Sequence, residues 1–108
     1  IITCFANPYG YENWVSKALE CYADSGDVVI LISSSGQSEN MLVGAKKAKS
    51  MNLNVVTFSG FLSDNPLRKL GDVNFWVDSE FYNIVEMTHH IWLLSIVDYI
   101  IENDKEFK

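Results

Sequence analysis

The sequence predicts an α/β fold built on a parallel sheet. Apolar runs at 28–32, 54–58 and 73–77 alternate with helical patterns, which is the order expected of right-handed βαβ units. The first run, 28–32, is continuous and rich in β-branched residues, as in a parallel strand buried on both faces. A chain of 108 residues that is 48% hydrophobic has room for one domain of this kind.

The first helix is predicted to begin near Asn7, a good capping residue, with Pro8 at its first position. We expect Glu12 and Asn13, early in this helix, to face solvent. A stripe at helical spacing follows, and residues 25–27 end the helix. The stripe comprises Tyr11, Trp14, Val15, Ala18, Leu19 and Tyr22.

A second helix is predicted from about Ser38 to Met51, with an inner stripe of small and apolar residues: Met41, Leu42, Ala45 and Ala48. After the second strand, the Asp64-Asn65 loop lies on the carboxyl side of the sheet and could touch a ligand. A short helix over 67–70 follows, and Gly71 ends it.

The last helix is predicted over about 82–103, and its apolar residues go nearly all the way round the axis. One side should meet the sheet and another should meet something else. That partner is either a second subunit or a further part of the chain, and both can hold. The small sheet and the start at Ile1 instead of a methionine also lead us to expect an incomplete domain.

Composition excludes several classes of function. The net charge of −6 disfavours nucleic acid, whose phosphates attract basic surfaces. Cys4 and Cys21 show no metal or redox spacing, which fits a reducing cytoplasm. The longest apolar stretch, Ile91 to Ile101, is too short for a bilayer and contains Asp98, so we expect no membrane partner.

The segment Ser33-Ser34-Ser35-Gly36-Gln37-Ser38 lies between the first strand and the second helix. Free backbone N–H groups and the dipole at a helix start favour an anion there, and serine hydroxyls add donors. A phosphate is the expected ligand. The alternative is a polar helix cap made by Ser38. The chain lacks the glycine-rich dinucleotide motif, the P-loop and the G-x-S-x-G elbow.

Several segments resemble the SIS (sugar isomerase) family, and its phosphoheptose isomerase branch in particular. They are 32–40 around the serine motif, 7–12 (Asn-Pro-Tyr-Gly-Tyr-Glu), 25–30, 55–60 and 70–73, in order and spacing. The resemblance implies a doubly wound, flavodoxin-like three-layer α/β/α fold, a sugar phosphate ligand and homo-oligomers, either dimers or tetramers. It also implies that residues 1–108 match the later portion of a single SIS domain, without its N-terminal part.

The resemblance assigns roles within the serine loop, which we define as residues 33–38. Ser33, Ser35 and Ser38 would hold the phosphate. Ser34, Gly36 and Gln37 would add backbone donors. The implied reaction interconverts aldose and ketose phosphates in bacterial carbohydrate metabolism. We expect no cofactor.

Catalytic positions of the branch are substituted in this chain. A glutamine and a histidine on the last helix of the family align with Val85 and Leu93, while polar residues align with Tyr82 and Pro8.

The remaining candidates for proton transfer are Glu86 and His90, one helical turn apart. Such a pair can equally be a surface or interface contact. His89 and His90 lack the i, i+4 spacing of helical zinc motifs, so no metal is expected.

Two functions therefore remain open. The first is a phosphosugar isomerase in which the serine loop grips the phosphate and Glu86 or His90 moves protons. The second is a non-catalytic SIS module, either a phosphosugar sensor or an oligomeric scaffold for another protein, which the substitutions at Val85 and Leu93 favour.

Overall fold

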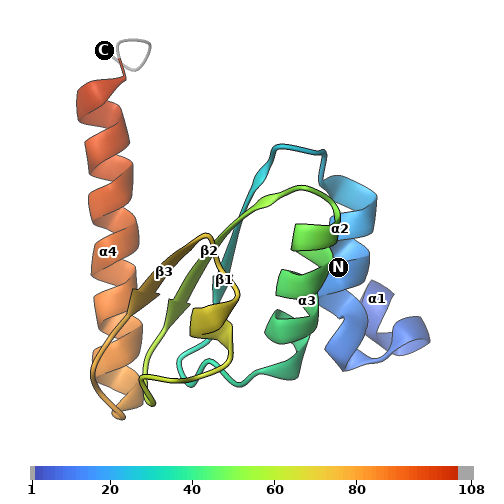
Figure 1. Cartoon of the computed structure of the whole chain (residues 1–108), viewed down its shortest axis with the longest axis horizontal. Helices are drawn as coiled ribbons and strands as arrows, with labels where there is room; N and C mark the ends of the chain where they lie inside the picture. The colour runs from blue at the N-terminus through green and yellow to red at the C-terminus, as the bar shows by residue number, and fades with distance from the viewer. Residues whose placement is uncertain (1, 105–108) are drawn as a thin grey trace.

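A computed structural model describes residues 2–104 as a three-stranded parallel sheet with helices on both faces (Figure 1). The strands lie in the order β1-β2-β3, so the predicted α/β class is confirmed. In chain order the elements are α1 (Ile2–Tyr9), the 3₁₀ turn η1 (Tyr11–Asn13), α2 (Trp14–Tyr22), β1 (Val28–Ile32), α3 (Glu39–Ser50), β2 (Asn54–Ser59), the 3₁₀ turn η2 (Leu67–Lys69), β3 (Val73–Trp76) and α4 (Tyr82–Asn103).

The central strand β2 organises the sheet. Leu31 of β1 pairs with Thr57, and Phe58 pairs with Phe75 of β3. Because all three strands are parallel, the loops that follow them gather at one edge, where the arrowheads lie in Figure 1. This carboxyl edge is where ligands bind in open α/β sheets.

Helices α2 and α3 cover one face and form the main core. Its buried members are Val15, Leu31, Ala45, Ala48, Leu53, Val55 and Leu67. The predicted inner stripe of the second helix is confirmed, since Ala45 and Ala48 are fully buried. Gly44 extends this stripe, because a Cβ there would lie 2.5 Å from Cγ1 of Val15. The small residues of α3 therefore let α2 pack close to it.

Helix α4 covers part of the other face through an aromatic cluster. The rings of Phe58 and Phe75 stack at 4.8 Å, and Trp92 of α4 lies 5.9 Å from Phe75. Most other apolar side chains of α4 are exposed, as expected for a helix with a second partner surface; they include Ile84, Met87, Ile91, Leu94, Val97, Ile100 and Ile101. The far half of α4 extends beyond the sheet (Figure 1).

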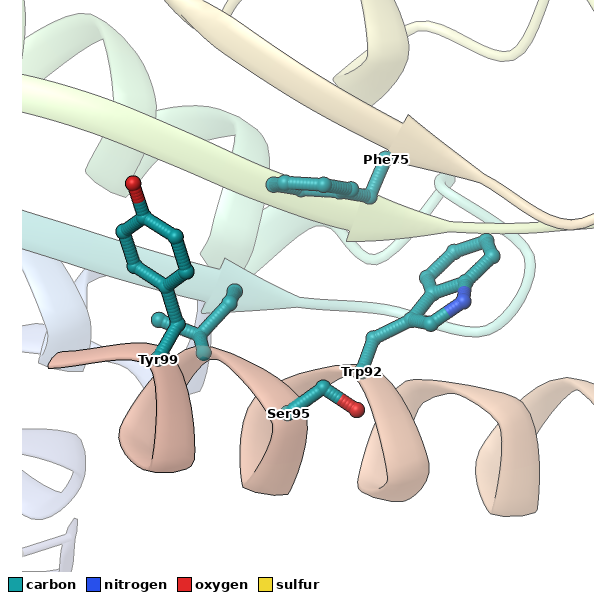
Figure 2. Close-up of a pocket in the computed structure, with 5 residues that line it drawn as sticks. Phe75, Trp92, Ser95 and Tyr99 are labelled. Atoms are coloured by element: carbon teal, nitrogen blue, oxygen red, sulfur yellow. The ribbon is translucent and has the colours of Figure 1, made fainter. Parts of the chain in front are cut away.

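A groove opens between the sheet and the second half of α4. Its volume is about 270 Å³, and Figure 2 shows aromatic rings on both of its walls, with Phe75 on β3 and Trp92 and Tyr99 on α4.

By length and composition alone, α4 could also cross a membrane, with a mean hydropathy of 1.3. One such helix is weak evidence for a membrane protein, because core helices share this composition.

The predicted start of the first helix is wrong. Residues 2–9 form α1 with Pro8 inside it, so Asn7 is not a cap and Pro8 is not the first helical residue. The chain turns at Gly10, whose φ of 87° suits glycine, and a 3₁₀ turn then leads into α2. The apolar stripe predicted as one helix is thus divided between η1 and α2.

The predicted burial of β1 on both faces is also wrong within residues 2–104. Val28, Ile30 and Ile32 are 62%, 47% and 41% exposed, whereas Leu31 between them is buried. The physical reason is that β1 lies at the edge of the sheet, on the side away from α4 (Figure 1). A β-branched run of this kind is typical of a strand covered on both faces, whereas residues 2–104 leave one face of β1 exposed.

Candidate functional site

The serine loop continues directly from the carboxyl end of β1. The N–H of Ser33 donates to the carbonyl of Phe58 at 3.0 Å, which carries the strand pairing into the loop. The chain then turns at Gly36, which is buried and has a φ of 70°. This left-handed conformation explains the glycine within the serine run.

Hydroxyl groups hold the loop in shape. The Oγ atoms of Ser33 and Ser38 lie 2.9 Å apart, and the N–H of Gly36 donates to Ser33 Oγ at 3.1 Å. The N–H of Gln37 donates to Ser35 Oγ at 3.2 Å. Ser33 is only 6% exposed, so it forms the floor of the loop, whereas Ser38 is exposed. The amides of Gly36 and Gln37 are thus bonded within the loop.

The start of α3 keeps free donors. Ser38 occupies the N-cap position, as the alternative interpretation expects, but its side chain makes no capping hydrogen bond. Within residues 2–104, no hydrogen bond from the N–H of Glu39 or Asn40 is present. Met41 N–H is satisfied by Asn40 Oδ1 at 2.9 Å. The amides of Glu39 and Asn40, at the positive end of the helix dipole, therefore have no hydrogen-bond partner among the described residues.

A cavity of about 500 Å³ lies at this helix start. Its lining joins the segment before α2 to the start of α3: Tyr11, Glu12, Ser38, Glu39, Asn40 and Met41. Glu12, expected only to face solvent, is exposed but borders this cavity, and its carboxylate folds back over Gly10. The contribution of η1 to the site could not be read from helical periodicity, because the 3₁₀ turn interrupts it.

Glu86 and His90 lie on the exposed side of α4. Among the described residues, no hydrogen bond or ion pair joins them to each other or to the serine loop. Their neighbour His89 instead points into the core, where its Nε2 lies 2.9 Å from the carbonyl oxygen of Ser59. The pair predicted for proton transfer is therefore separate from the serine loop within this chain.

Val85 lies close to the serine loop. It is fully buried, and a Cβ built on Gly60 would lie 2.7 Å from its Cγ1 and 3.1 Å from the carbonyl oxygen of Ser34. Val85, which the resemblance predicts to align with a glutamine of the family, therefore packs at Gly60 near Ser34 and carries only an aliphatic side chain. Leu93 is half-buried.

Electrostatic and metal-binding features add little to the site. A hydrogen bond from Lys47 lowers the pKa of the Glu20 carboxyl group. This pair links α2 to α3 away from the loop. Within residues 2–104 there is no group of three or more His, Cys, Asp or Glu side chains that could hold a metal ion. Cys4 and Cys21 are exposed free thiols.

Fold and site together define an α/β domain with a serine-rich loop at the carboxyl edge of a parallel sheet. The chain is 36% identical over 104 residues to the phosphoheptose isomerase of Helicobacter hepaticus, covering 95% of the chain and 52% of the relative. The corresponding protein of Fusobacterium nucleatum is 34% identical over 97 residues, covering 90% of the chain and 50% of the relative. No protein-family model matches the chain.

Solved structures agree with the fold. The phosphoheptose isomerase of Francisella tularensis superposes with a TM-score of 0.88 at 24% identity, over 94% of this chain and 55% of that one. The enzyme of Neisseria gonorrhoeae gives 0.86 at 24% identity, over 92% and 56%. The chain is thus related to the SIS-type phosphoheptose isomerases, as its motifs predict. It spans about half the length of the relatives it matches.

Proposed function

We propose that the chain is part of a single SIS domain that binds a sugar phosphate through the serine loop and interconverts its aldose and ketose forms in the cytoplasm. The observation that carries the proposal is the start of α3, where Ser38 makes no side-chain cap and the N–H groups of Glu39 and Asn40 have no partner within residues 2–104. The relationship to phosphoheptose isomerases supports a phosphorylated sugar as the ligand.

The phosphate would be held by groups with distinct tasks. The exposed hydroxyl of Ser38, the half-buried Ser35 and the two free amides of α3 provide donors. Ser33 lies deeper and organises the loop through Gly36 and Ser38. It reaches a ligand by exchanging its bond to Ser38, since hydroxyl hydrogens rotate freely.

Isomerisation needs a group that moves a proton between adjacent carbons. Glu86 and His90 are suited by chemistry but are exposed on α4. In this proposal they act on a sugar bound to a second copy of the chain, in a homo-oligomer that covers the apolar sides of α4. Glu12, which borders the cavity at the start of α3, is a further carboxylate within the same loop region.

Titration with phosphosugars tests the binding step. In ¹H–¹⁵N spectra, a panel of aldose and ketose phosphates that includes a phosphoheptose should shift the amides of residues 34–40. Ser38→Ala should weaken binding by about tenfold, the effect of losing one hydrogen bond to a charged group. The control is Ser50→Ala at the other end of α3, where the hydroxyl donates to the carbonyl of Lys47. Unshifted loop amides would refute phosphosugar binding.

The catalytic step has its own test. Glu86→Gln and His90→Gln should abolish aldose–ketose exchange, followed by NMR, while phosphosugar affinity stays within about twofold of the original. Asp98→Asn, another exposed carboxylate change on α4, is the control. Binding without turnover in the unmodified protein would instead support the non-catalytic module, the second candidate, which the buried Val85 favours.

A further inference from the structure

Asn65, in the loop between β2 and η2, is 1% exposed and has every polar atom engaged. Its Oδ1 accepts from the N–H of Arg68 at 2.9 Å. Its two Nδ2 hydrogens are shared among three acceptors at the end of β2: Ser59 Oγ at 3.1 Å, Gly60 O at 3.0 Å and Leu62 O at 3.0 Å. The amide has no donor left for a ligand, so any role in binding is indirect.

The serine loop rests directly on this side chain. A Cβ at Gly36 would collide with the carboxamide oxygen and carbon of Asn65. Two residues further on, the N–H of Leu67 donates to the carbonyl of Gly36 at 3.0 Å. The loop therefore has two supports: its own hydroxyl network on one side and the 65–67 segment on the other.

The geometry points to Asn65 as a positioning residue for phosphate binding: it fixes the turn at Gly36 so that the serine hydroxyls and the free amides of α3 converge on one anion. This inference rests on the proposed phosphosugar binding. A site loses affinity when the residues that support it are left free to move, even though they never touch the ligand.

An amide is the side chain that fits this place. Aspartate could accept from the N–H of Arg68 but would set a carboxylate against the carbonyl oxygens of Gly60 and Leu62. Leucine has a similar size but offers neither donor nor acceptor, and buried carbonyls without partners are costly. Asparagine alone of these three satisfies both sides of the loop.

The chain offers a matched control at Asn74, which supports a different glycine turn. Its Nδ2 donates to the carbonyl of Gly71 at 2.9 Å, and its Oδ1 accepts from the N–H of Gly71 at 3.0 Å and from Thr57 Oγ1. A Cβ at Gly71 would also collide with Asn74. This turn precedes β3 and therefore lies at the opposite edge of the sheet from the serine loop.

The experiment compares Asn65→Ala with Asn74→Ala in the full chain, titrated with inorganic phosphate and then with a phosphoheptose. Both variants should lose stability in urea unfolding. Asn65→Ala alone should weaken binding, by about tenfold or more, and displace the Gly36 amide resonance in the free protein. Asn74→Ala should bind within about twofold of the original protein. Equal affinities for the two variants would overturn the positioning role.

Two further readouts separate the outcomes. If the original protein shows no loop shifts with either ligand, the proposed function fails, and the role of Asn65 fails with it. If Asn65→Ala does not fold, Asn65→Ser, which keeps an acceptor for Arg68, is compared in the same way. In the original protein, the Asn65 side-chain NH₂ resonances should shift with phosphate in step with the Gly36 amide. NH₂ resonances that stay constant while Gly36 shifts would refute the coupling.

Discussion

Val85 on α4 packs directly against Gly60 at the end of β2: a Cβ on Gly60 would lie 2.7 Å from Cγ1 and 2.8 Å from Cγ2 of Val85. Contact between these two residues brings α4 down onto the carboxyl edge of the sheet, beside the carbonyl of Ser34. The close approach requires a glycine, and it places Val85 of the last helix near the serine loop.

Gly60→Ala should therefore destabilise the fold by about 1–3 kcal/mol, the usual cost of overpacking a core. Val85→Ala in the same chain removes both clashing methyl groups and should recover part of that loss. Urea unfolding of the two single variants and the double variant measures the coupling. Strictly additive losses would mean that the two side chains do not compete for this space.

The two bonded hydroxyls of the serine loop should differ in their effect on stability. Ser33→Ala leaves the buried N–H of Gly36 without its side-chain acceptor, although the carbonyl of Ser33 still accepts from it at 3.1 Å, so a loss of about 1 kcal/mol is expected. Ser38→Ala should cost less, because its exposed hydroxyl makes no cap. Thermal and urea unfolding check the order, which an equal or larger loss for Ser38→Ala would contradict.

Substitution of the two adjacent histidines of α4 should change the free energy of unfolding by different amounts. His89→Leu removes a buried hydrogen bond to the carbonyl of Ser59, which keeps a second partner in the N–H of Val77. A loss of about 1 kcal/mol is therefore expected. His90→Leu, on the exposed side, should stay within about 0.5 kcal/mol. Similar losses in urea unfolding would show that both rings are buried in solution.

Acid should weaken the link between α2 and α3. The ammonium of Lys47, 2.7 Å from the carboxylate, holds the pKa of Glu20 below its ordinary value of 4.5, and Lys17 adds to the effect. A carboxyl group whose pKa is lowered in the folded state stabilises the fold above its unfolded pKa, and this contribution is lost as the pH falls through the folded pKa.

The stability difference between the original chain and Glu20→Gln should thus be present at neutral pH and vanish in acid. It should also be small and shrink in high salt, because the pair is exposed. Urea unfolding at several pH values measures it, with Asp98→Asn as the control. A difference that grows below the ordinary pKa of Glu20 would contradict the assignment.

The pattern of apolar residues predicts most of the fold. The strands predicted at 54–58 and 73–77 differ by one residue each from β2 and β3, and the last helix agrees in full. The prediction of the first helix failed because Gly10 and a 3₁₀ turn divide an apolar stripe whose spacing is still that of a helix. The predicted burial of β1 failed because a β-branched run indicates a strand but does not show how far other elements cover each of its faces, and alternate residues of β1 are exposed within residues 2–104.

The sequence predicts the candidate site as a motif but does not predict the hydrogen bonds and contacts that hold the loop. Four serines in the loop and a following helix indicate an anion site. Neither the bond between Ser33 and Ser38 nor the carboxamide of Asn65 beneath Gly36 follows from spacing, since each depends on how the chain turns. Asn65, expected at most to touch a ligand, is instead buried behind the loop.

The exposed edge of β1 has a practical consequence for work with this chain. Val28, Ile30 and Ile32 present alternate branched side chains along a strand that has a neighbour only on its β2 side within the described residues. Backbone groups of an edge strand readily recruit another strand. Concentrated solutions of the chain should therefore self-associate and precipitate, and a lysine placed at Ile30 should keep it dispersed.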